Sequence, residues 1–109
     1  MAESGRIREF EEVAELMPDD SVVRFGLAGA YLDAGRVEAA VTEYETTVRL
    51  KPDYSAAYRG LGRALERAGR VADARAAYAT GIEVATRNGD LQTRKEIEVF
   101  LRRLDRADG

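Results

Sequence analysis

The chain has 109 residues, of which 34% are charged and 45% hydrophobic, and its formal net charge is -3. This length and composition predict one compact soluble domain spanning residues 1–109. Because Cys and His are both absent, disulfides and Cys/His metal sites are excluded, and the commonest general base and the most reactive nucleophile are missing. We therefore expect a binding protein that is not an enzyme and has no metal and no cofactor.

The first predicted element is a helix over residues 5–17. Its apolar residues at helical spacing are Ile7, Phe10, Ala14 and Met17. Phe10 lies 34 residues before Tyr44, and Pro18 lies 34 residues before Pro52. We therefore interpret this helix as the second half of an incomplete N-terminal repeat.

Residues 21–54 and 55–88 are two copies of one unit. Ala34-Gly35-Arg36-Val37 recurs 34 positions later as Ala68-Gly69-Arg70-Val71. When the two units are aligned without a gap, 11 of 34 positions are identical. Such a period is typical of repeat proteins, in which each unit packs on its neighbours.

Each unit predicts two antiparallel helices. The apolar stripes are Leu27, Ala28 and Tyr31, then Ala40, Tyr44 and Val48 in the first unit, and Tyr58, Leu61, Gly62 and Leu65, then Ala74, Tyr78, Ile82 and Ala85 in the second. Gly35 and Gly69 stand where a helix ends in a left-handed residue. Asp19 and Asp53 each follow a proline, and we expect them to be helix N-caps rather than metal ligands. Because Gly26 and Gly60 recur at one repeat position, we expect close helix approach there.

The last predicted element is a capping helix over residues 90–106, with Asp90 as its N-cap. Its core-facing stripe consists of Ile97, Phe100, Leu101 and Leu104. Its other face carries Lys95, Glu96, Arg102, Arg103 and Arg106. This division between an apolar face and a solvated face is what the end of a stack of helices requires.

The repeat resembles that of the tetratricopeptide repeat family, whose pattern is Trp-x2-Leu-Gly-x2-Tyr, then Ala-x3-Phe, then Pro. The pattern falls on Arg24, Leu27, Ala28, Tyr31, Ala40, Tyr44 and Pro52, and again on Tyr58, Leu61, Gly62, Leu65, Ala74, Tyr78 and Thr86. Arg24 replaces the usual aromatic residue, and Thr86 replaces the proline, which lets that helix continue to about Gly89. The resemblance implies an all-α, right-handed α-solenoid of antiparallel helix pairs, with about six helices and no strands.

The resemblance also implies a protein-interaction module that binds a peptide or partner helix in a concave groove, in an adaptor or scaffold role. Family positions place Val22, Phe25, Gly29, Leu32, Ala56, Arg59, Arg63 and Glu66 along this groove. Arg59 and Arg63 are one helical turn apart, where they would bind a carboxylate or phosphate of the partner. The family's clamp for chaperone C-termini is absent, since Phe25, Gly29 and Gly60 occupy its Lys and Asn positions.

Two structural alternatives remain at these positions. Arg59 and Arg63 would pair with Glu66 or with other neighbours at helical spacing, and would then be a solvated face. Phe25 would belong to the core and pack on the N-terminal helix.

The charge distribution supports other functions. Residues 1–50 carry 5 Arg and 11 acidic residues, a sum of -6, whereas residues 51–109 carry 12 basic and 9 acidic residues, a sum of +3. This asymmetry favours a homodimer or larger homo-oligomer that pairs through its ends. Nucleic-acid binding is less favoured, because the basic residues near the C-terminus lack stacking aromatics and the pI is near 5.1. The sequence has no apolar segment long enough to span a membrane or serve as a secretory signal, so we expect a cytoplasmic protein.

Overall fold

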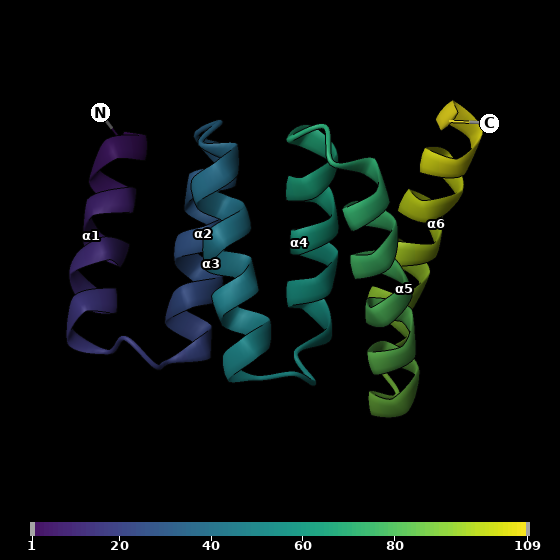
Figure 1. The fold of residues 1–109 in the computed structure, drawn as a ribbon. Coiled ribbons are helices and arrows are strands. Elements are labelled where there is room, and N and C mark those ends of the chain that lie inside the picture. The colour runs from purple at the N-terminus through teal and green to yellow at the C-terminus, as the bar shows by residue number, and fades with distance from the viewer. Residues whose placement is uncertain (1, 109) are drawn as a thin grey trace.

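The computed structural model describes residues 2–108 of the chain, and the side chains of residues 5–107. Within this part there are six helices and no strand, as the sequence predicts. The helices are α1 (Ala2–Leu16), α2 (Ser21–Asp33), α3 (Val37–Leu50), α4 (Ser55–Arg67), α5 (Val71–Asn88) and α6 (Leu91–Asp108). Figure 1 shows a row of helices with α1 at one end and α6 at the other. The fold is an all-α solenoid.

The helices form two layers with different spacing. Each helix packs against the next along the chain, and α4 also packs against α2 and α6. In the described part of the chain, α1, α3 and α5 do not pack against one another. The inner layer of α2, α4 and α6 is therefore tightly spaced, and the outer layer of α1, α3 and α5 is splayed. This difference curves the row so that the inner layer forms its concave face.

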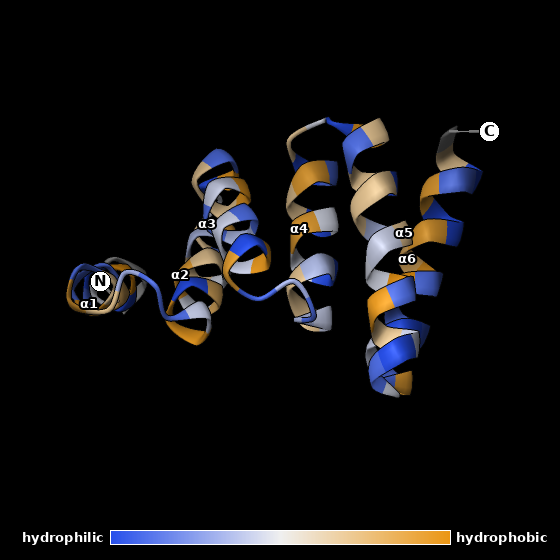
Figure 2. Cartoon of the chain, turned by 60° about the horizontal axis from the view of Figure 1, so that its bottom comes forward, coloured by the Kyte–Doolittle hydropathy of each residue, from blue (hydrophilic) through white to orange (hydrophobic). Residues whose placement is uncertain are grey.

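One hydrophobic core runs through the whole stack. Its buried residues extend from Ile7 in α1 to Leu104 in α6. Apolar and polar residues are interleaved along the helices (Figure 2), as expected for helices that bury one side. No helix in the described part of the chain combines the length and apolar character needed to cross a membrane.

The predicted glycine turns are confirmed. Gly35 and Gly69 have φ angles of +79° and +78°, in the left-handed region that costs an L-residue about 1–2 kcal/mol. At the first turn the Gly35 amide donates to the Leu32 carbonyl at 3.0 Å, and the Arg36 amide donates to the Tyr31 carbonyl at 2.8 Å. These two bonds satisfy the carbonyl groups left open at the end of α2.

The predicted N-caps Asp19 and Asp53 are wrong. The cap of α2 is Asp20, whose carboxylate accepts from the Val23 amide at 3.1 Å. The cap of α4 is Tyr54, which has no side-chain capping bond. Asp19 and Asp53 lie in the turn between helices, and one more residue is needed before the chain enters the helix. The capping position is therefore one residue later than the prediction in both repeats.

The close helix approach expected at Gly26 and Gly60 is confirmed. The Phe10 ring of α1 lies over Gly26, and the Tyr44 ring of α3 lies over Gly60. A Cβ atom at either glycine would overlap the ring. The same aromatic-on-glycine contact thus joins an outer helix to the next inner helix twice, 34 residues apart.

The second repeat ends differently from the first. With Thr86 in place of proline, α5 has 18 residues where α3 has 14, and it ends at Gly89 with a φ of +72°. Asp90 then caps α6, as predicted: its carboxylate accepts from the Ser55 hydroxyl at 2.7 Å and from the Thr93 amide at 3.2 Å. These bonds lower the pKa of Asp90.

Candidate functional site

The eight residues predicted to line the groove lie on α2 and α4, in the inner layer. Val22 is 65% exposed, Arg63 is also exposed, and Leu32 is only 9% exposed. The partly exposed residues are Phe25, Gly29, Ala56, Arg59 and Glu66. Seven of the eight therefore reach the surface, whereas Leu32 contributes mainly to the core.

Aromatic rings form one end of the groove. The Phe25 ring stacks on Tyr54 with a centroid distance of 4.9 Å, and it meets the edge of Tyr44 at 5.9 Å. The Tyr44 hydroxyl lies 3.8 Å from the position of a Cβ atom added at Gly29. It therefore underlies the surface between α2 and α4. Burial raises the pKa of Tyr44 above its ordinary value.

The two predicted groove arginines have different environments. Arg59 forms an ion pair with Glu96 of α6, and its side chain is 29% exposed. The guanidinium of Arg63 lies over the Phe100 ring, 4.9 Å from its centroid. Glu66 accepts a hydrogen bond from the Tyr78 hydroxyl, and burial together with this carboxylate raises the pKa of Tyr78. In the described part of the chain neither arginine pairs with Glu66.

A small pocket of about 170 Å³ lies beside Arg63, between α4 and α6. Its lining residues are Arg63, Glu66, Arg67, Phe100 and Arg103. One Nη of Arg67 donates to the Leu32 carbonyl at 3.1 Å, which fixes this side chain across α2 and α4. Three guanidinium groups and one aromatic ring thus surround a space at the C-terminal end of the groove.

Glu96, Phe100 and Arg103 were not among the groove residues predicted from the sequence. Phe100 was predicted to lie in the core, and the two charged residues were predicted to lie on a solvated outer face. Helix α6 begins 36 residues after the start of α4, whereas α4 begins 34 residues after the start of α2, because α5 is one turn longer than α3. The signal was present in the missing proline at Thr86, which shifts α6 out of the 34-residue register.

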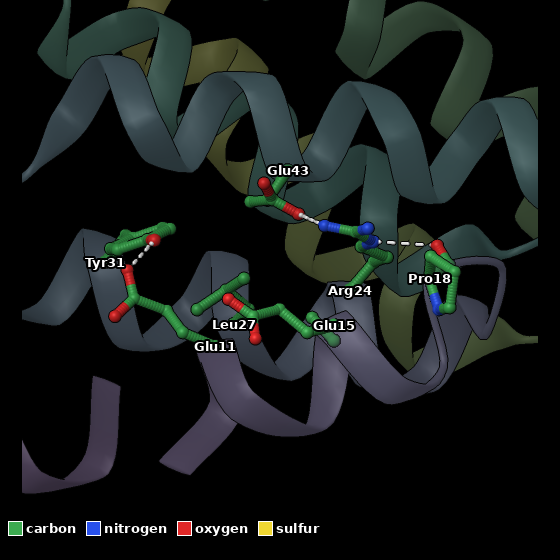
Figure 3. Close-up of a pocket in the computed structure, with 8 residues that line it drawn as sticks. Glu11, Glu15, Pro18, Arg24, Leu27, Tyr31 and Glu43 are labelled. Atoms are coloured by element: carbon green, nitrogen blue, oxygen red, sulfur yellow. Dashed lines mark hydrogen bonds and ion pairs between the residues drawn. The ribbon is translucent and has the colours of Figure 1, made fainter. Parts of the chain in front are cut away.

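A larger pocket of about 430 Å³ lies on the convex side, between α1 and α3 (Figure 3). Two of the Arg24 nitrogens donate there, to the Pro18 carbonyl at 2.9 Å and to Glu43 at 3.0 Å. The Tyr31 hydroxyl donates to Glu11 at 2.6 Å, and burial together with this bond raises the pKa of Tyr31 to about 12. The polar groups of this pocket mostly bind one another.

A similar pocket of about 310 Å³ lies one repeat later, over α4. There Tyr58 occupies the place of Arg24, and its hydroxyl donates to the Pro52 carbonyl at 2.7 Å. Arg24 therefore retains the hydrogen bond to a proline carbonyl that the aromatic residue makes in the second repeat. Both pockets follow from the splay of the outer helices, and we assign them a structural origin.

In the described part of the chain, no group of three or more acidic side chains is placed to hold a metal ion. The convex carboxylates of Glu11 and Glu43 have hydrogen-bond partners within the protein. The chemistry of the concave face is that of aromatic, guanidinium and small side chains.

Comparisons with known proteins agree with the fold. The profile described as tetratricopeptide repeat matches residues 7–50 and 25–90. A TPR repeat-containing protein of Pseudomonas aeruginosa is 46% identical over 89 residues, which cover 82% of this chain and 85% of that protein. The solution structure of a Bordetella parapertussis protein has a TM-score of 0.81 and 34% identity, covering 94% of this chain and 89% of its own. The first TPR domain of Spaghetti (RPAP3), bound to an HSP90 peptide, has a TM-score of 0.81 at 22% identity, and the match covers 93% of this chain and 75% of that one.

Proposed function

Because this chain belongs to the tetratricopeptide repeat family, we propose that it is a protein-interaction module whose concave groove binds a peptide or a helix of another protein. Members of this family generally serve interaction rather than catalysis, and we assign the chain an adaptor role in the cytoplasm with no chemistry of its own. The observation that carries the proposal is the change from aromatic to cationic side chains along the concave face. Aromatic rings around Phe25 form one end, and the guanidinium of Arg63 lies at the other.

The two ends indicate the chemistry of the partner. An apolar side chain would lie against Phe25 and Val22, where burial of its surface supplies about 25 cal/mol per Å². An acidic group would lie near Arg63, because an exposed guanidinium can donate two parallel hydrogen bonds to a carboxylate or phosphate. A neighbour with this fold is bound to a peptide, which supports peptide binding as the role proposed for this chain. Since the chaperone clamp residues are replaced by Phe25, Gly29 and Gly60, we propose a partner other than a chaperone tail.

A capture experiment with matched charge changes tests this proposal. The groove variant Val22→Glu/Arg63→Glu alters both ends of the concave face. The control variant Ala72→Glu/Arg49→Glu makes the same change in net charge at exposed positions of α5 and α3, in the outer layer. Proteins bound by the wild type and the control, but lost from the groove variant in quantitative mass spectrometry, support the groove. Equal capture by the groove variant refutes it.

A second candidate function, self-association through the ends, has its own observation. At the N-terminal end of the stack Leu16 is 83% exposed, Met17 47% and Val13 40%. These apolar side chains lie on the acidic half of the sequence, and a second copy could cover them with its basic half. We expect a dimer by light scattering at low salt that Leu16→Glu dissociates. A monomer at every concentration rules this candidate out.

A further inference from the structure

We propose that Arg63 and Arg103 form a discrete anion site that binds one carboxylate or phosphate group of the partner, and that Arg59 is not part of it. The inference rests on the proposed groove function and names the recognition element at its cationic end. It differs from the sequence-based expectation, in which Arg59 and Arg63 act as the pair.

Arg59 is occupied by an internal partner. Its guanidinium pairs with Glu96, and both side chains are partly shielded, with 29% and 39% exposure. An incoming anion would have to displace this carboxylate or lie beside it, and like charges in contact repel. Arg59 therefore joins α4 to α6 and is a positioning residue at most.

Arg63 is exposed and oriented by an aromatic ring. Its guanidinium carbon lies 4.9 Å from the centroid of the Phe100 ring, which is a cation–π contact. A guanidinium carries five N–H donors, and the printed contact of Arg63 is with a ring rather than with a carboxylate. In the described part of the chain no carboxylate forms an ion pair with Arg63.

Arg103 brings a second guanidinium to the same space. It lies three residues after Phe100 on α6, which is the same side of the helix, and it lines the pocket with Arg63 and Arg67. It is exposed and has no ion pair within the described residues. Arg67 adds a third positive charge, held in place by its bond to the Leu32 carbonyl.

The charge and size of the pocket fit a single anionic group. Glu66 is its one acidic residue, and that carboxylate accepts from the Tyr78 hydroxyl. Three arginines against one glutamate leave an excess of positive charge. The volume of about 170 Å³ exceeds several times the roughly 30 Å³ that one water molecule occupies in the liquid, so a carboxylate or phosphate has room. Planar bidentate recognition of such groups is the chemistry for which arginine is suited.

NMR titration of the arginine Nε–H signals tests the site directly. The probes are sodium phosphate and sodium acetate, each added at constant ionic strength against sodium chloride. We expect the signals of Arg63 and Arg103 to shift saturably with at least one of the two probes. If only phosphate saturates, the site selects phosphoryl groups; if only acetate saturates, it selects carboxylates; if both do, it accepts anions of either kind.

Variants separate this pair from the neighbouring arginines. Arg63→Gln and Arg103→Gln should each weaken binding about tenfold, the equivalent of losing one charge-assisted hydrogen bond. Arg59→Gln, and Arg102→Gln as an exposed control of equal charge, should change it less than about twofold. The proposal is overturned if neither anion gives saturable shifts, or if Arg59→Gln weakens binding as much as Arg63→Gln. Loss of partner capture in the groove variant together with absent anion shifts would leave the groove standing and reject this site alone.

Discussion

Two alanine substitutions in the inner layer, Gly60→Ala and Gly29→Ala, should have opposite effects on stability. Both glycines lie inside helices, where alanine is favoured over glycine by about 0.5–1 kcal/mol. The local space differs. A Cβ atom at Gly60 would overlap the Tyr44 ring, whereas at Gly29 the nearest atom is the Tyr44 hydroxyl at 3.8 Å, an ordinary contact.

The magnitude at Gly60 follows from how firmly the ring is held. Tyr44 is 5% exposed and contacts the edge of Phe25, so it cannot retreat from a new methyl group without moving its neighbours. Overpacking of this kind costs about 1–3 kcal/mol, and a direct overlap with a buried ring belongs at the upper end. After the gain in helix propensity, Gly60→Ala should lose about 2 kcal/mol, while Gly29→Ala should gain about 0.5–1 kcal/mol.

Urea unfolding followed by helical circular dichroism measures both variants against the wild type. The slopes of the transitions should match, so that differences in midpoint report stability. For a domain of this size the two changes correspond to a fall of about 8 °C in melting temperature for Gly60→Ala and a rise of up to about 4 °C for Gly29→Ala. If Gly60→Ala is as stable as the wild type, the packing argument at the helix crossing is refuted.

Three further predictions concern backbone strain and titration. Gly35→Ala should lose about 1–2 kcal/mol in thermal melts, because the +79° φ is retained while no atom lies within 4 Å of the new methyl group; an unchanged melting temperature would contradict this. Asp90→Ala should lose about 1 kcal/mol of stability at pH 7, because it removes the capping bond from the Thr93 amide and the bond from the Ser55 hydroxyl. Because folding lowers the pKa of Asp90, this contribution is present above the unfolded pKa of about 3.9 and disappears as pH falls through the folded value. Urea unfolding should therefore show a difference in stability between the wild type and Asp90→Ala at neutral pH that vanishes at acid pH. The phenolate absorbance of Tyr31, measured as the difference between the wild type and Tyr31→Phe, should appear near pH 12 rather than 10, because burial and Glu11 favour the neutral phenol. The neutral Tyr31 side chain therefore stabilises the fold fully below pH 10, and this contribution is lost as pH rises through 12.

The sequence was sufficient for the fold because the repeat pattern is governed by local requirements. Gly35 and Gly69 mark turns that need a left-handed residue, and Gly26 and Gly60 mark crossings with no room for a side chain. These constraints act within one unit and recur 34 residues later. The first residue of a helix was harder to predict. Asp19 and Asp20 are adjacent and both can cap a helix, and only the geometry of the turn shows that the cap is Asp20.

The candidate site was harder to predict because it depends on contacts between units. Whether Arg59 is available or already paired is decided by α6, and the position of Glu96 depends on the extra turn of α5. The family positions named residues on α2 and α4 only, so Phe100 and Arg103 were assigned to the cap. Periodicity predicts a repeated surface, but it fails where the period itself is interrupted.

The position of Tyr44 has a consequence for how this surface can diverge. The Tyr44 ring fills the crossing at Gly60, contacts Phe25 and lies near Gly29, so replacing it would change the core packing and the aromatic end of the groove together. The arginines at the other end are surface side chains whose exchange leaves the core untouched. New binding preferences are therefore accessible by point substitution at the cationic end without a change in core packing, whereas a substitution of Tyr44 at the aromatic end changes both.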